Sequence, residues 1–158
     1  METRYQHTQI ARLILAILGV GWFVDTGVLL FLLFASGLGL SSCIGPLIVA
    51  IILPVLMILH GTLTVTLNDE FLVVRFGPGL IHKRFALKDI ESCRVVRNPW
   101  YYGFGIRRLR NGWLYNVSGL DAVELKTRDG KEHRIGTDVP DELQRAITQS
   151  LSQPAQRH

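Results

Sequence analysis

Two long apolar runs near the beginning of the chain constrain its fold more than any other feature. Residues 13–34 contain one charged side chain, Asp25, and residues 43–60 contain no Asp, Glu, Lys or Arg. About 20 helical residues cross the hydrocarbon core of a bilayer, so both runs are long enough to span it. We therefore expect residues 1–60 to form a transmembrane helical hairpin.

A cleaved signal peptide is the main alternative for the first run. The apolar region of a signal peptide has only about 7–15 residues. The first run is longer than that, and a second apolar run follows it closely. The transmembrane interpretation is therefore favoured.

The charges around the hairpin predict its orientation. Arg4 and Arg12 precede the first run, the connector at 35–42 is uncharged, and Lys and Arg are frequent after residue 60. Basic residues near spans favour the cytoplasmic side of a membrane. We therefore expect the N- and C-termini both to be cytoplasmic.

Asp25 is the one acidic residue inside a predicted span. An ionisable side chain at this depth is expensive and is often functional. One interpretation is a structural or oligomer contact, and the other is a proton or ion site. Because the second run offers almost no polar partner, the structural or contact interpretation is favoured.

The chain changes character after residue 60, where apolar and polar residues alternate. In residues 62–68 the leucine and valine side chains face one side and the threonines face the other, which is typical of a half-buried strand. Turn residues separate further segments of this kind. We predict strands at 62–68, 71–76, 80–87, 90–97, 113–117, 122–127 and 132–136.

The last predicted element is an amphipathic helix. Asp138 can cap it, Pro140 lies in its first turn, and acidic residues follow. A helix across one end of a small antiparallel barrel covers its open edges. The sequence therefore predicts an α+β fold, in which the transmembrane hairpin precedes a pleckstrin-homology-like barrel of about seven strands with a C-terminal capping helix at 61–152. A plain β-sandwich is the alternative, and residues 153–158 are expected to form a flexible tail.

Three segments carry a family resemblance: NPWYYGFGIR, GWLYNVSGLDAVEL and RIGTDVPDELQRAI. With them, most of residues 61–150 resembles the bacterial PH-domain family of membrane-associated proteins. The resemblance implies a domain that follows a pair of transmembrane helices in the bacterial inner (plasma) membrane. It implies no particular activity. The first hairpin loop, Asn68-Asp69-Glu70, is acidic, whereas phosphoinositide-binding PH domains have basic residues there, so headgroup binding at that loop is not expected.

The segment 98–110 concentrates aromatic residues and arginines. One interpretation is a structural turn, shaped by Pro99, Gly103 and Gly105, with a solvated arginine run. The other is a contact surface for lipid or a partner, because aromatic rings anchor at membrane interfaces and arginines attract anionic headgroups. The candidate binding residues are Trp100, Tyr101, Tyr102, Arg107, Arg108 and Arg110.

No catalytic or metal-binding pattern is present in the sequence. The histidines are scattered without metal-ligand spacing, and no nucleophile or phosphate-loop motif occurs. We expect no cofactor, no enzyme activity and no nucleic-acid partner. The expected function is a protein or peptide interaction or assembly module at the cytoplasmic membrane surface, with an unknown partner or further copies of the chain. The alternative is a sensor of anionic lipid headgroups.

Overall fold

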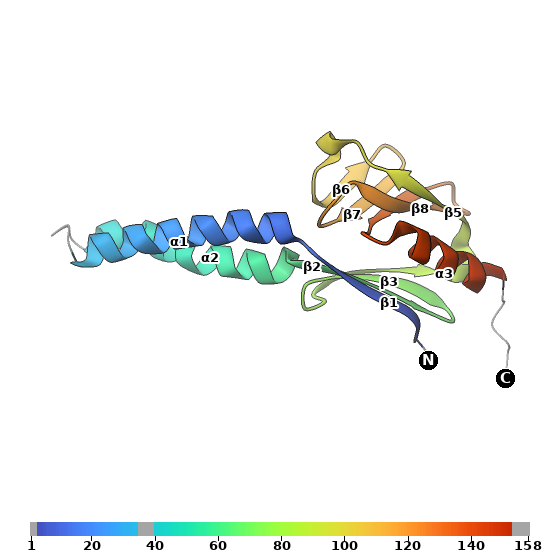
Figure 1. Ribbon diagram of the computed structural model, residues 1–158, viewed down its shortest axis with the longest axis horizontal. Helices are drawn as coiled ribbons and strands as arrows, with labels where there is room; N and C mark the ends of the chain where they lie inside the picture. Colours follow the sequence, from blue (N-terminus) through green and yellow to red (C-terminus); the bar gives the residue numbers. More distant parts are fainter. Residues whose placement is uncertain (1–2, 35–39, 153–158) are drawn as a thin grey trace.

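The computed structural model describes residues 3–34 and 40–152 and shows two long helices that project from one end of a β domain (Figure 1). Helices α1 (Arg12–Phe34) and α2 (Ile44–His60) lie side by side, and the 3₁₀ turn η1 (Leu40–Cys43) precedes α2. Both helices are long and apolar enough to cross a membrane, which agrees with the predicted spans at 13–34 and 43–60. The predicted tail at 153–158 and part of the predicted connector, residues 35–39, lie outside the described residues.

A hydrogen bond links the two helices near the middle of the hairpin. Pro54 lies inside α2 and has no amide hydrogen to donate to the carbonyl of Ala50, four residues earlier. The indole Nε1 of Trp22 in α1 donates to that carbonyl oxygen at 3.0 Å. Because an unsatisfied backbone carbonyl in an apolar environment is costly, this contact stabilises one alignment of the helices.

The remaining elements build the β domain. Its strands are β1 (Thr3–Ile10), β2 (Thr62–Asn68), β3 (Phe71–Phe76), β4 (Ile81–Ala86), β5 (Ile90–Arg97), β6 (Gly105–Leu109), β7 (Gly112–Asn116), β8 (Asp121–Thr127) and β9 (Glu132–Gly136). The short 3₁₀ turns η2 (Leu87–Asp89) and η3 (Trp100–Tyr102) precede β5 and β6, and helix α3 (Pro140–Ser152) follows β9.

The first sheet includes a strand that precedes the helices in the sequence. Its order is β1-β2-β3-β4, and all three pairs are antiparallel. The amide of Ala11 donates to the carbonyl of Gly61 at 2.8 Å. The hairpin is therefore an insertion between two paired strands. The sequence does not predict β1, because TRYQHTQI has few apolar residues and no clear alternation.

The second sheet has the order β5-β8-β9-β7-β6. Its pairs are antiparallel except for β7 and β9, which are parallel. β6 occupies part of the segment that the sequence analysis interpreted as a turn. Its residues GIRRL contain no alternation of apolar and polar side chains, which is why no strand is predicted there.

The structure corrects two expectations about the β domain. It contains two further strands beyond the seven predicted, β1 and β6. The predicted barrel is also wrong, because the two described sheets stay separate and β4 and β6 are edge strands without pairing across the corner between them. Helix α3 packs on β5, β8 and β1 and fills the opposite corner. The domain is thus a two-layer β structure with one covered corner and one open corner.

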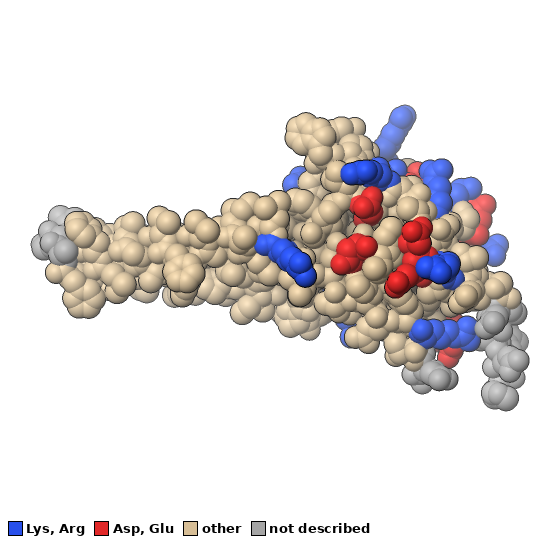
Figure 2. All heavy atoms as spheres, in the orientation of Figure 1, with Lys and Arg blue, Asp and Glu red and all other residues tan. Residues whose placement is uncertain are grey.

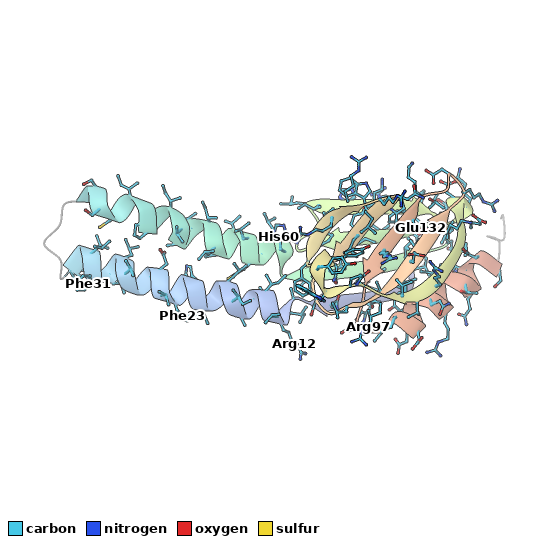
Figure 3. All side chains as sticks on the ribbon, turned by 90° about the horizontal axis from the view of Figure 1, so that it is seen from above. Arg12, Phe23, Phe31, His60, Arg97 and Glu132 are labelled. Atoms are coloured by element: carbon cyan, nitrogen blue, oxygen red, sulfur yellow. The ribbon has the colours of Figure 1, made fainter. Side chains whose placement is uncertain are left out.

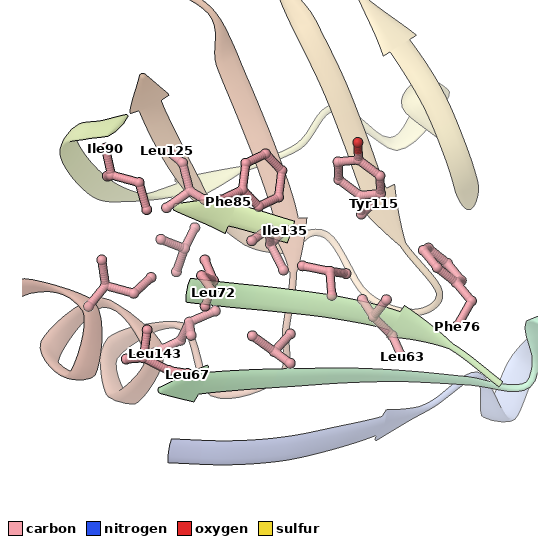
Figure 4. Close-up of a cluster of buried hydrophobic side chains, with 14 of the residues drawn as sticks. Leu63, Leu67, Leu72, Phe76, Phe85, Ile90, Tyr115, Leu125, Ile135 and Leu143 are labelled. Atoms are coloured by element: carbon pink, nitrogen blue, oxygen red, sulfur yellow. The ribbon is translucent and has the colours of Figure 1, made fainter. Parts of the chain in front are cut away.

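The core lies between the sheets (Figure 4). Alternate side chains of β2, namely Leu63, Val65 and Leu67, face it, as the period of two predicts. Leu143 and Ile147 of α3 are fully buried against the same core. At its other end, Phe76 and Tyr115 approach each other with ring centroids 6.5 Å apart.

Candidate functional site

The hairpin packs directly on one end of the β domain, here called the hairpin end. A side chain at Gly77, in the β3–β4 loop, would come within 2.9 Å of the backbone oxygen of Leu59 in α2. A small hollow at this end is lined by Ile14, Leu56 and His60 of the helices and by Phe104 and other residues of the domain. Figure 3 shows Arg12 and His60 at this junction and Arg97 on the part of the domain nearest to it. The domain is therefore held close to the helices without a linker.

Three large side chains are exposed around the hairpin end. Trp100 and Tyr101 of η3 are 80% and 67% exposed, and Leu80 of the β3–β4 loop is 76% exposed. η3, the yellow turn in Figure 1, lies at the end of the domain nearest to the helices. Nothing in the described chain covers these three side chains, so they are available to an external surface.

Tyr102 differs from its two aromatic neighbours because it packs on an ion cluster. The guanidinium of Arg134 lies 5.8 Å from the centroid of the Tyr102 ring. Nε of Arg134 donates to Oε2 of Glu124 at 2.8 Å, and Nε of Arg94 donates to Oε1 of the same carboxylate at 2.7 Å. Glu124 is only 4% exposed. Tyr102 thus has a structural role, because its ring covers the Arg134 guanidinium on the outer face of the second sheet.

The structure separates the three arginines that the sequence grouped. Arg107 and Arg108 are neighbours in β6 and therefore face opposite sides of the sheet. Arg107 pairs with Leu114 on the outer side, and Arg108 pairs with Trp113 on the inner side. Arg110 lies beyond the strand, in the turn to β7, and is exposed. Trp100 and Tyr101 lie together, but the three arginines do not form one patch with them.

Other arginines lie nearer to the hairpin end. Arg12 begins α1, Arg97 ends β5 just before η3, and the side chain of Arg75 lies beside Gly79 in the β3–β4 loop. All three are exposed. Sequence reasoning did not select them because they belong to three separate elements, and only the tertiary fold brings those elements to one end. Figure 2 shows that charged side chains gather on the domain and leave the rest of the hairpin nearly bare.

The first hairpin loop lies at the far end of the domain from the helices. Oδ1 of Asn68 accepts hydrogen bonds from the amides of Glu70 and Phe71, which shapes the loop. Arg4 donates to Oδ1 of Asp69 at 2.6 Å. The acidic loop is therefore occupied by a local ion pair and faces away from the hairpin end.

Asp25 lies in α1 and is half-buried. Its Oδ2 atom and the hydroxyl of Thr26 are shielded and have no hydrogen-bond partner among the described residues. Among all the residues that the structure describes, no three His, Cys, Asp or Glu side chains are grouped so that they could hold a metal ion.

The open corner between the sheets forms a groove of about 920 Å³, here called the open groove. Strand β4 makes one wall, and Ile106 of β6 with Trp113 of β7 makes the other. Buried Phe85 and Tyr115 lie at its floor with ring centroids 6.1 Å apart. The sequence analysis did not find this groove, because its residues come from six strands and two turns.

Three titratable groups of the open groove have shifted pKa values, and burial raises that of Tyr115. Hydrogen bonds from Lys131 and Thr127 lower the pKa of Asp129, so this carboxylate stays ionised and already paired. Burial lowers the pKa of His133, and the charge of Lys83 lowers it further. His133 is 7% exposed, its ring lies 4.9 Å from that of Phe85, and its Nδ1 has no partner among the described residues.

The lowered pKa of His133 predicts a loss of stability in mild acid. The folded chain binds a proton at His133 less readily than the unfolded chain, whose histidine has a pKa near 6.5. Stability is therefore lost as the pH falls below that value. In detergent micelles, the thermal midpoint of the full chain should fall between pH 7.5 and pH 5.5, and His133→Leu should weaken that dependence. His82→Gln, at an exposed histidine, is the matched control. An equal pH dependence in the His133→Leu chain would contradict this account.

No model of a known protein family matches this chain, and no curated protein matches it either. The likeness to the bacterial PH-domain family accordingly stays a prediction from the sequence.

Proposed function

We propose that this chain is a multi-pass protein of the bacterial inner membrane whose pleckstrin-homology-like domain lies at the cytoplasmic surface. There the domain binds a protein partner, or further copies of the chain, without catalysis. The hairpin anchors it, and both chain termini are cytoplasmic. The basic residues around the hairpin end support this orientation, because Arg12, Arg75 and Arg97 would face the inner leaflet.

One observation carries this proposal most strongly. The hairpin is inserted between two paired strands, and the domain has unpaired strand edges at an open corner beside exposed side chains. Free strand edges beside aromatic residues are a common means of protein recognition. A domain held this close to a membrane meets only partners that reach the membrane surface.

Photo-crosslinking in native membranes tests this function. A photoreactive amino acid at Ile81, in the open groove, or at Trp100, at the hairpin end, should give a defined crosslinked species. The same amino acid at Arg145, exposed on α3, serves as the control. Equal labelling from all three positions, or no discrete species from the first two, would argue against an interaction module.

A second candidate function is the sensing of anionic lipid, favoured by the exposure of Trp100, Tyr101 and Leu80 at the hairpin end. Aromatic side chains prefer the interface, and each nearby basic residue adds about 1 kcal/mol of attraction to an anionic surface. A full chain with Trp22→Phe and Trp113→Phe keeps Trp100 as its one tryptophan.

In nanodiscs containing brominated lipid, Trp100 fluorescence should be quenched more strongly as the fraction of anionic lipid rises. Replacing Arg12, Arg75 and Arg97 by Gln should remove this dependence. Replacing Arg107, Arg108 and Arg110 by Gln should have the smaller effect, because these arginines are spread over different faces. If the quenching of Trp100 is independent of the fraction of anionic lipid in the parent chain and in both variants, lipid sensing is excluded.

A further inference from the structure

The unpaired edge of β4 is accessible along the open groove. β4 pairs only with β3, and residues 81–84 are exposed. The amide of Leu87 donates to the carbonyl of Glu70 at the end of this pair. Because bonded and non-bonded pairs alternate in an antiparallel ladder, the backbone groups of His82, Arg84 and Ala86 point to the open edge. This edge offers donors and acceptors to a further strand.

The groove beside this edge is suited to alternate side chains of such a strand. Its floor is aromatic, with Phe85 and Tyr115, and its far wall carries Trp113 and Ile106, which are 41% and 39% exposed. In an added strand every second side chain faces the same way. Apolar side chains at those positions would cover the aromatic floor.

The charge around the groove is mostly positive. Lys83, Arg84 and Arg128 line it, and within the described chain none of them has a carboxylate partner. Of the two lining carboxylates, Asp129 is paired with Lys131, which leaves Asp89 as the only other negative group. Arg108 adds a further cation on the same inner face. This imbalance favours an acidic ligand.

His133 gives a second, independent sign of a ligand. It lines the groove, it is more than nine-tenths buried, and its Nδ1 makes no hydrogen bond to a described residue. A buried polar atom without a partner costs stability. The wall of the groove therefore holds a buried polar atom whose hydrogen-bonding capacity is unused in the free chain.

We propose that the open groove binds an acidic, extended segment of a partner protein, which pairs with the free edge of β4 and places alternate apolar side chains on the aromatic floor. This inference rests on the proposed function as an interaction module and assigns the binding site and the class of partner. Main-chain pairing gives affinity in this mode, and the groove gives specificity.

A defined peptide tests this site with the full chain in nanodiscs of neutral phosphatidylcholine. The probe is a fluorescein-labelled octapeptide of alternating valine and glutamate. Fluorescence anisotropy should show saturable binding that weakens about tenfold when lysine replaces glutamate, because the groove is positively charged. N-methylation of alternate backbone amides should weaken binding by at least as much, because it removes the pairing groups.

Variants of the chain locate the site. The double change Lys83→Glu with Arg128→Glu should weaken binding of the glutamate peptide about tenfold or more and improve binding of the lysine peptide. Arg84→Pro removes an outward amide at a strand edge, where proline is tolerated, and should also weaken binding. Arg97→Glu is the control, at an exposed arginine outside the groove.

The possible outcomes separate this inference from the proposed function. Absence of saturable binding, or equal binding of the N-methylated peptide, would overturn the groove as a strand-binding site. Its cations would then serve only to keep the β4 edge from self-association. Crosslinking at Trp100 in native membranes would still support the proposed function in that case. Loss of crosslinked species at every position, with intact peptide binding, would instead overturn the membrane-surface role.

Discussion

A fragment that begins at Gly61 should fail to fold stably, because it lacks β1. In the full chain β1 pairs with β2 along its length, and Tyr5 packs against the core. Each backbone hydrogen bond makes a net contribution of roughly 1 kcal/mol to the free energy of unfolding. A typical domain is stable by only about 5–15 kcal/mol. The loss of an entire paired strand therefore removes a large part of the stability. Near-ultraviolet circular dichroism and urea titration should show no cooperative transition in the fragment.

A synthetic peptide that supplies β1 provides the control for this prediction. Adding a synthetic peptide of residues 1–11 in excess to the Gly61 fragment should restore part of the cooperative transition, because β1 binds at the edge of β2. If the Gly61 fragment alone unfolds cooperatively, at the same urea concentration as the full chain, then β1 is dispensable for folding.

Glu124→Ala should be the most destabilising single substitution at a charged residue of the domain. The carboxylate is buried and accepts from both Arg94 and Arg134, and the side chain of Arg134 is itself only 20% exposed. Removing one partner of a buried ion pair costs about 3–5 kcal/mol, because the other charge is left unpaired. For a domain of this size, a loss near 3 kcal/mol lowers the thermal midpoint by roughly 15 °C. Differential scanning calorimetry of the full chain in detergent measures this shift.

Two further chains test the reason for this loss. Arg94→Ala should cost about 1 kcal/mol or less, because the Arg94 side chain is 69% exposed and solvent screens its charge. Glu124→Leu combined with Arg134→Met removes both buried charges and should recover most of the stability. A double variant no more stable than Glu124→Ala would show that the side-chain volume, and not the unpaired charge, explains the loss.

The sequence predicts those elements whose pattern is local. The two apolar helices follow from length and composition, and strands such as β2 follow from strict alternation, with Leu63, Val65 and Leu67 facing the core. Helix α3 follows from its apolar face and the acidic residues of its first turn. Each of these signals depends on neighbouring residues only, so no knowledge of the tertiary fold is needed. The predicted cap, Asp138, instead pairs with His7 of β1, a contact that the local sequence does not reveal.

The rest depends on contacts between distant segments. β1 is a mostly exposed edge strand, so its polar sequence carries no alternation to detect. The sequence also treats Trp100, Tyr101 and Tyr102 alike, whereas Tyr102 alone packs on Arg134, which lies 32 positions along the chain. The open groove exists only because β4 and β6 belong to different sheets and stay unpaired at one corner. No local pattern encodes such a corner.

The central claim is that a membrane hairpin is inserted into a β domain that folds without it. Ala11 and Gly61 are joined by a backbone hydrogen bond, so an Asn-Gly turn between them should replace residues 12–60 without changing the pairing of β1 and β2. Carbonate extraction of membranes with hydrogen-exchange mass spectrometry tests both halves of the claim. We predict that the full chain stays in the membrane pellet, whereas the shortened chain is soluble and keeps slow exchange in β2, β3 and β8. A shortened chain that remains in the pellet, or that exchanges rapidly throughout these strands, would contradict the account.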